Sequence, residues 1–331
     1  MIVAVLLFLL GAVLLIKGGD WFVDGATGIA RRFHVPDLII GATVVSIGTT
    51  LPEVMVSSTS AVQGISSIAY GNAIGSIICN TALIAAITIA IAPSEVNRET
   101  LKMPLLFFFT SAVYYAGIAY FVGRFSRVTG IILLLIFAVY MYILIKQAVS
   151  LSKSAMNSLP QTESESGEKS DEKETPLFKE IMLLVIGAVF IAFGARFLVD
   201  NGTIIAQQLG VPETVIALTF VALGTSLPEL VTAIVSLAKG HGSLSLGNII
   251  GANLFNLVLV SGMAITLRPF ELPAEKQIAG MNASLVVDVP MMFAVMILMT
   301  IPALIKGRLK RYQGIILLAL YTGYVIFQFI N

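Results

Sequence analysis

The chain contains an internal repeat of 70 residues that aligns without a gap. Residues 11–80 match residues 187–256 at a constant offset of 176, and 27 of the 70 aligned positions are identical. The most similar block reads Gly-Thr-Thr-Leu-Pro-Glu at 48–53 and Gly-Thr-Ser-Leu-Pro-Glu at 224–229. A repeat of this length predicts a fold built from two structurally related halves.

The composition assigns these halves to a membrane. Of the 331 residues, 57% are hydrophobic and 12% are charged, and the mean hydropathy is +0.94. Soluble domains carry about twice that share of charged residues. The net charge of +1 leaves no basic surface for nucleic acid, and the single cysteine, Cys79, excludes an intramolecular disulfide. We therefore expect an integral membrane protein that contacts the lipid bilayer and binds no nucleic acid.

The hydropathy pattern predicts an all-α membrane protein with ten transmembrane helices. A helix needs roughly 20 apolar residues to cross the bilayer core, and the chain has no strand-like alternation. The predicted spans are residues 2–23, 38–62, 67–91, 103–122, 128–149, 178–200, 214–237, 244–267, 281–304 and 312–330. Since each half has five spans, the two copies must enter the membrane from opposite sides. This predicts two inverted five-helix repeats, an architecture common in secondary transporters.

The basic residues predict the orientation of these spans. Placing both termini outside the cell puts 14 of the 20 Lys and Arg residues on the cytoplasmic side. We expect a multi-pass protein of the cell (plasma) membrane with a first transmembrane repeat at 1–150, a hydrophilic cytoplasmic linker at 151–177 and a second repeat at 178–331. The first span has a counterpart in the sixth, so we interpret it as part of the mature fold and not as a signal peptide.

Two glutamates lie near the middle of predicted spans. Glu53 falls in the second span and Glu229 in the seventh, and neither span contains a basic residue. Carboxylates at mid-membrane are costly and usually mark an ion or proton pathway. Two unpaired carboxylates that face each other would repel strongly. We therefore expect bound cations or protons between them.

Proline residues next to the glutamates predict broken helices at this level. Pro52 and Pro228 each remove a backbone donor and crowd the carbonyl group four residues earlier. We expect breaks around residues 46–50 and 222–226, which would leave backbone oxygens free to bind a cation. Hydroxyl groups from nearby Thr and Ser residues lie within one turn of each glutamate; these residues are Thr49, Thr50, Thr225 and Ser226.

The third and eighth spans carry a matching polar stripe. Asn72, Ser76 and Asn80 are spaced four residues apart and so share one helix face. The second copy of this stripe reads Asn248, Ala252 and Asn256. Calcium prefers about six to eight oxygen ligands, and two carboxylates match the charge of one divalent or two monovalent cations. These residue types therefore favour a cation site at the two-fold axis.

The two Pro-Glu motifs, each followed by a Gly-Asn-x-x-Gly block, resemble the alpha repeats of the cation/calcium exchanger superfamily, in its prokaryotic sodium/calcium exchanger branch. The resemblance covers nearly the whole chain. It implies that the first and sixth helices slide across a rigid core of the other eight. It also implies a set of residues that bind the transported Ca²⁺ and Na⁺: Glu53, Glu229, Thr49, Thr50, Thr225, Ser226, Ser46, Ala222, Ser76, Asn80 and Asn256.

The chain departs from the family pattern at two of these positions. Ala252 stands where many members carry a serine, so one sodium-coordinating hydroxyl is missing. Asn256 stands where potassium-dependent and many prokaryotic members carry aspartate. A potassium requirement is therefore not expected, whereas the number of sodium ions stays open.

The leading hypothesis is a secondary antiporter that exchanges Ca²⁺ for Na⁺, with no enzymatic activity, no cofactor and no obligatory protein partner. An antiporter that couples calcium or another divalent cation to H⁺ is the first alternative, although the acid of the usual Gly-Asn-x-x-Glu motif is absent. An intramembrane acid protease needs aspartates in a Gly-x-Gly-Asp setting, which neither Glu53 nor Glu229 has. A cation channel is the third alternative, and it would conduct without counter-ion dependence.

Overall fold

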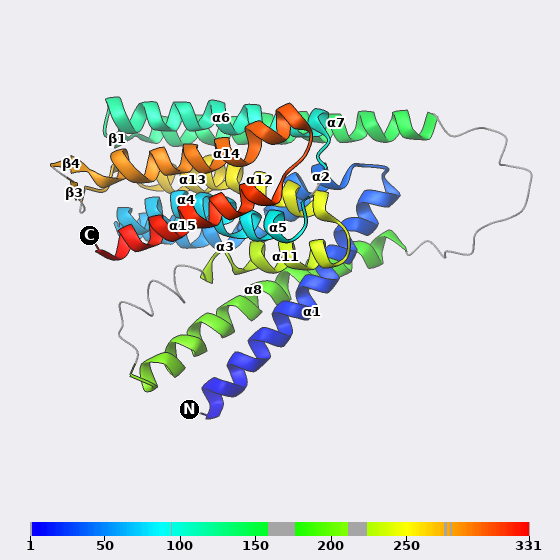
Figure 1. Ribbon diagram of the computed structural model, residues 1–331, viewed down its shortest axis with the longest axis horizontal. Coiled ribbons are helices and arrows are strands. Elements are labelled where there is room, and N and C mark those ends of the chain that lie inside the picture. Colours follow the sequence, from blue (N-terminus) through cyan, green and yellow to red (C-terminus); the bar gives the residue numbers. More distant parts are fainter. Residues whose placement is uncertain are drawn as a thin grey trace, which may run out of the picture.

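The protein is a bundle of long helices in a computed structural model that describes residues 2–93, 95–157, 176–210, 224–274, 277–278 and 280–330. In Figure 1 most helices run along the long axis of the view, whereas α1 and α8 slant away from it. The first half comprises α1 (Ile2–Arg32), α2 (Asp37–Ile40), η1 (Gly41–Val45), α3 (Ser46–Gln63), α4 (Ser66–Cys79), η2 (Asn80–Ala85), α5 (Ala86–Ile91), α6 (Arg98–Phe121) and α7 (Arg127–Asn157), where η denotes a π-helical turn.

The second half repeats this order of helices. It comprises α8 (Leu177–Gln208), α11 (Leu227–Ala238), α12 (Gly242–Phe255), η5 (Asn256–Val260), α13 (Ser261–Leu267), η6 (Ser284–Asp288), α14 (Val289–Lys306) and α15 (Arg311–Ile330). Two-residue strands pair at one end of the bundle: β1 (Arg124–Phe125) with β2 (Phe270–Glu271), and β3 (Gln277–Ile278) with β4 (Met281–Asn282).

Eight helices in the described part of the chain are long and apolar enough to cross a membrane. They correspond to eight of the ten predicted spans. The tenth span is α15, which has 20 residues, enough to cross about 30 Å. The seventh is represented by the 12 residues of α11, because residues 211–223 lie outside the described part. Several helices run past the predicted ends, and α7 extends to Asn157, inside the segment predicted as a linker.

The internal repeat is visible in the backbone. Helices α4 and α12 both have 14 residues, and they begin and end at positions that differ by 176. Each is followed by a π-helical turn whose first residue is an asparagine, Asn80 in η2 and Asn256 in η5. A π turn inserts one extra residue into the helix and is frequent at functional sites. The two halves therefore share this irregularity as well as their sequence.

The predicted break in the second span takes a different form. Residues Ser46–Gln63 are α-helical through Pro52, and the irregular turn is η1, which ends just before Ser46. Pro52 still leaves the Gly48 carbonyl without its helical donor. In the second half, by contrast, Thr225 and Ser226 form a turn and α11 begins at Leu227 with Pro228 in its first turn. The break expected at 46–50 was therefore wrong in position, and the described part of the break at 222–226 is confirmed.

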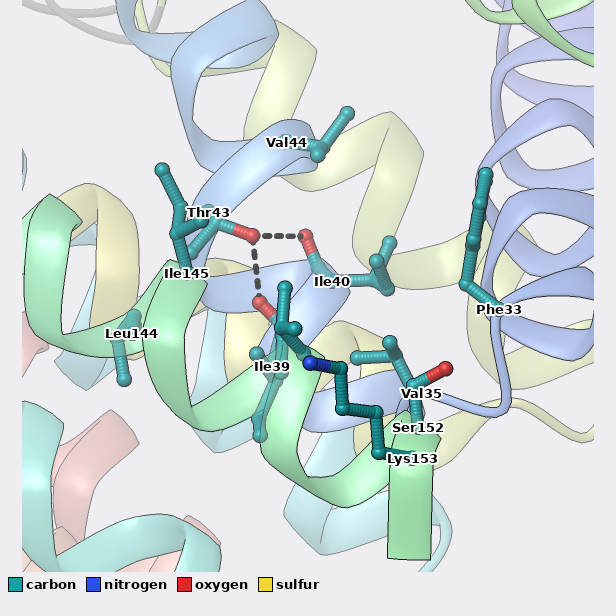
Figure 2. Close-up of a pocket in the computed structure, with 12 residues that line it drawn as sticks. Phe33, Val35, Ile39, Ile40, Thr43, Val44, Leu144, Ile145, Ser152 and Lys153 are labelled. Atoms are coloured by element: carbon teal, nitrogen blue, oxygen red, sulfur yellow. Dashed lines mark hydrogen bonds between the residues drawn. The ribbon is translucent and has the colours of Figure 1, made fainter. Parts of the chain in front are cut away.

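Figure 2 shows the surroundings of η1. The Thr43 hydroxyl donates to the Ile39 carbonyl oxygen at 2.7 Å, and the Ile40 oxygen lies at 3.4 Å. This contact supplies a local hydrogen bond where the π turn disturbs the helical ladder. An apolar cavity of about 410 Å³ lies between η1 and α7, with Lys153 on its wall, and none of the predicted ion-site residues lines it.

Helices α1 and α8 form an antiparallel pair held together by glycines. A Cβ atom on Gly11, Gly18 or Gly25 would lie 2.5–2.9 Å from backbone atoms of α8. Gly187 and Gly194 approach the α1 backbone as closely from the other side. Small residues at regular spacing allow two membrane helices to pack backbone against backbone. The two helices that are equivalent in the repeat are thus packed closely against each other.

Candidate ion-binding site

The two predicted glutamates lie at the centre of the bundle. Glu53 is on α3 and Glu229 is in the first turn of α11, and both side chains are completely buried. The two glutamates are on neighbouring helices, because α3 and α11 are in contact. No Lys, Arg or His in the described part of the chain forms an ion pair with either carboxylate. A buried pair of like charges without a counter-charge is unstable unless a cation or proton joins it.

The two carboxylates and several other buried polar groups lack hydrogen-bond partners. Within the described residues, partners are missing for four carboxylate oxygens, two hydroxyl oxygens and two amide oxygens from three repeat-related pairs: Glu53 and Glu229, Thr50 and Ser226, Asn80 and Asn256. Buried polar atoms normally have a partner, and each exception needs an explanation. Hard oxygen atoms of this kind and number are the ligands that Ca²⁺ and Na⁺ take.

The packing of the π turns brings these residues together across the repeat. Turn η2, which begins at Asn80, packs against α11, the helix of Glu229. Turn η5, which begins at Asn256, packs against α3, the helix of Glu53. Each asparagine therefore belongs to a π turn of one half of the chain that packs against the glutamate helix of the other half. The site is built by both repeats and cannot form from one alone.

A pair of equivalent hydrogen bonds connects the halves around the glutamates. The Thr49 hydroxyl donates to Asn248 Oδ1 at 3.2 Å, and the Thr225 hydroxyl donates to Asn72 Oδ1 at 3.2 Å. Because Thr49 and Thr225 are repeat partners, as are Asn72 and Asn248, the same contact occurs twice around the two-fold axis. The Thr49 and Thr225 hydroxyls thus orient the two asparagine side chains. The hydroxyls of Thr50 and Ser226, by contrast, have no partner among the described residues.

The remaining predicted residues have different surroundings. The Ser46 hydroxyl is within hydrogen-bond distance of the Gly41 and Asn248 carbonyl oxygens, at 2.8 and 3.0 Å. Ser76 lines a cavity of about 330 Å³ that also contacts Asn72 and Thr225. Ala222 lies outside the described residues.

Asn72 and Asn248 connect the glutamate helices to the helices packed against them, and the sequence identified these two residues only as part of the polar stripe. Asn72 donates to the Glu53 carbonyl oxygen at 3.2 Å and to the Ser57 hydroxyl at 2.9 Å. Asn248 accepts from Ser46 and Thr49. The Gly-Asn dipeptide that occurs in both repeats was the sequence feature that could have identified the role of both asparagines. A third polar residue, Asn253, has no repeat partner of its type, and it donates to Thr81 of η2 at 2.7 Å.

The described part of the chain contains no cluster of three or more His, Cys, Asp or Glu side chains that could hold a metal ion. Asp288, an acid within the ninth predicted span, accepts hydrogen bonds from Tyr324 at 3.0 Å and Gln328 at 3.1 Å. Of the eight unpartnered oxygens of the candidate site, four belong to the two carboxylates and four are neutral hydroxyl or amide oxygens.

The chain is similar to proteins that are described as sodium/calcium exchangers. A family model described as sodium/calcium exchanger protein matches residues 3–146 and 179–330. The sodium/calcium exchanger MaX1 of Methanosarcina acetivorans is 32% identical over 98% of both chains, and the inner membrane protein YrbG of Escherichia coli is 36% identical over 82% of both. A structure of the sodium-calcium exchanger NCX_Mj, soaked with Na⁺ and Sr²⁺, matches 98% of both chains with a TM-score of 0.78 and 31% identity.

The family match spans both repeats and leaves out only the region around the hydrophilic linker. The structural match extends over the same two halves, so the inverted-repeat architecture expected from the sequence is confirmed. The chain belongs to the sodium/calcium exchanger family.

Proposed function

We propose that this protein exchanges Ca²⁺ for Na⁺ across the membrane by alternating access, and that both ions use one site between Glu53 and Glu229. One observation carries the assignment of the site. Two completely buried carboxylates, one from each repeat, have no ion-pair partner among the described residues. Buried hydroxyl and amide oxygens without hydrogen-bond partners lie on or next to the same helices and in the π turns packed against them. One Ca²⁺ or two Na⁺ ions would neutralise both charges.

The ligands divide into three groups in this proposal. The carboxylates of Glu53 and Glu229 bind both kinds of ion. The hydroxyls of Thr50 and Ser226 and the amides of Asn80 and Asn256 complete the oxygen shell, because their buried oxygens lack other partners. Backbone oxygens and hydroxyls of the remaining predicted residues supply flanking sodium sites; these residues are Ser46, Thr49, Ser76, Ala222 and Thr225.

The charge of the empty site explains why transport is an exchange. Without ions, Glu53 and Glu229 would be two bare carboxylates on contacting helices in a low-dielectric interior, where like charges repel strongly. Changing conformation in that state would be unfavourable, because the sliding first and sixth helices would have to move their apolar side chains past the uncompensated charge. Occupation by either ion removes this barrier. After releasing one ion, the protein therefore returns to its first conformation only when the other ion has bound.

The proposed orientation follows the basic residues. Both termini lie outside the cell membrane, and the hydrophilic segment at 151–177 lies in the cytoplasm between a first repeat at 1–150 and a second at 178–331. The positive-inside bias of the Lys and Arg residues supports this arrangement. Labelling of a cysteine introduced near each terminus with a membrane-impermeant reagent tests it.

The test of the function is calcium uptake into proteoliposomes. Vesicles loaded with Na⁺ and diluted into Na⁺-free buffer should accumulate radioactive calcium, and vesicles diluted into equal Na⁺ should not. A pH jump at equal Na⁺ separates this coupling from H⁺ coupling. Uptake driven by the pH gradient alone would keep the site but overturn the counter-ion, and uptake with no gradient dependence would indicate a channel.

A further inference from the structure

A lysine at the end of α11 connects this helix to α1. Lys239 Nζ lies 2.7 Å from Asp24 Oδ1 and 3.5 Å from Asp20 Oδ1, and it donates to the Asp20 carbonyl oxygen at 3.0 Å. Asp20 and Asp24 are one turn apart on α1, so one cation holds two anions of another helix. Neither aspartate belongs to the proposed ion site. This cluster therefore links the α1–α8 pair to the rest of the bundle.

The helices α1 and α11 are also in close contact next to this cluster. A Cβ atom on Gly19 would lie 2.7 Å from Val231 and 3.0 Å from Val235. The absence of a side chain at position 19 is thus what lets α11 lie directly on α1. Ion pair and close packing together keep this side of the bundle closed.

The repeat-related interface, between α8 and α3, is different. The positions equivalent to Lys239, Asp20 and Asp24 are Gln63, Arg196 and Asp200. Arg196 pairs with Asp200 on its own helix at 3.5 Å, and both side chains are well exposed. A cavity of about 590 Å³, lined by these two residues, separates α8 from α3.

The two interfaces therefore represent a closed and an open arrangement of the same repeated elements. In a transporter with inverted repeats, the alternative conformation arises when the halves exchange their arrangements about the two-fold axis. The contact of Lys239 with Asp20 and Asp24 is then broken in the second conformation. The exchanged contact would bring Gln63 to Arg196 and Asp200, where a neutral amide gives no ion pair.

We propose that Lys239, Asp20 and Asp24 form a one-sided ionic latch that favours the conformation in which the α1–α11 side is closed. In the proposed orientation this side faces the cytoplasm, so the latch favours the outward-open conformation and uptake of ions from outside. The three side chains are 28–52% exposed, which screens their interaction. An exposed ion pair of this kind changes a two-state equilibrium by about two- to five-fold.

The inference rests on the alternating access proposed above, and a cross-linking experiment tests it without ion transport. The only cysteine of the chain, Cys79, is replaced by alanine, and cysteines are introduced as Thr59→Cys with Ala195→Cys. This pair is the repeat equivalent of Val235 and Gly19, and a Cβ atom on Gly19 would lie 3.8 Å from Val235 Cβ, which is within disulfide distance. The introduced pair should therefore form a disulfide only in the second conformation. The rate of oxidative cross-linking in proteoliposomes then reports the population of that conformation.

We expect Lys239→Gln to raise the cross-linking rate about two- to five-fold, and Lys239→Arg to leave it unchanged. Lys102→Gln is the matched control, because Lys102 pairs with Glu99 on its own helix. An unchanged or slower rate in Lys239→Gln would overturn the latch. Absence of the disulfide in every variant would overturn the exchange of interfaces on which it depends. Loss of Na⁺-dependent calcium uptake in the unmodified protein would instead refute the proposed function, whatever the cross-linking shows.

Discussion

The substitution Gly247→Ala would displace α12, the helix that carries Asn248 and its cross-repeat hydrogen bonds. A Cβ atom at Gly247 would lie 2.2 Å from the Leu38 carbonyl oxygen, whereas ordinary contact begins at 3.4 Å. Since the Leu38 oxygen is a backbone atom, α12 must move away from α2 by about 1 Å. The neighbouring Asn248 accepts hydrogen bonds from Ser46 and Thr49 at 3.0–3.3 Å, and such a shift takes them past the length of a real hydrogen bond.

The expected cost follows from these contacts. Overpacking costs about 1–3 kcal/mol, and a lost buried hydrogen bond adds about 1 kcal/mol. The better helix propensity of alanine offsets up to about 1 kcal/mol. Gly247→Ala should therefore lower the free energy of unfolding by about 1–3 kcal/mol and reduce sodium-dependent calcium uptake.

Thermal unfolding of the purified protein measures this effect. Gly117→Ala is the control, because a Cβ atom at Gly117 meets no atom within 4 Å and the same propensity gain applies. We expect the melting temperature of Gly247→Ala to fall below that of the unmodified protein, and that of Gly117→Ala to stay equal or rise slightly. Equal melting temperatures for both variants would refute the close approach of α12 to α2.

Further predictions concern the ligands and their support. Ala252→Ser adds a hydroxyl one turn before Asn256 and should raise the apparent sodium affinity of calcium exchange; an unchanged sodium dependence would exclude position 252 as a ligand. Thr49→Val and Thr225→Val each remove one of the equivalent cross-repeat hydrogen bonds and should each lower the free energy of unfolding by about 1 kcal/mol. Melting temperatures that stay unchanged in both valine variants would show that these bonds do not hold the halves together.

The sequence predicted the features that depend on spacing and polarity. Hydropathy located the spans because each membrane helix must satisfy its backbone internally. The repeat predicted two related halves, and the cost of burying a carboxylate singled out Glu53 and Glu229. Both proved to be completely buried. The helix ends were less predictable, because helices continue into water for several residues, as α1 does to Arg32.

The details of the site required the three-dimensional structure. Pro52 predicted a break at residues 46–50, but the helix continues there, and the irregular turn is the π turn η1 that precedes it. A π turn depends on the packing of neighbouring helices and has no simple sequence signal. The contact of Thr49 with Asn248 joins residues far apart in the sequence, and so does the contact of Lys239 with Asp24. Such pairs become visible only when the folded structure shows how the two halves pack against each other.

Equilibrium binding of radioactive calcium to the purified protein tests the central claim, that Glu53 and Glu229 form one site shared by calcium and sodium. The unmodified protein should bind Ca²⁺, and Na⁺ should displace it. Glu53→Gln and Glu229→Gln should each abolish binding while the protein stays folded. Asp288→Asn, at an acid that is hydrogen-bonded to Tyr324 and Gln328, should bind as the unmodified protein does. Calcium binding that persists in both glutamine variants and is still displaced by sodium would contradict the account.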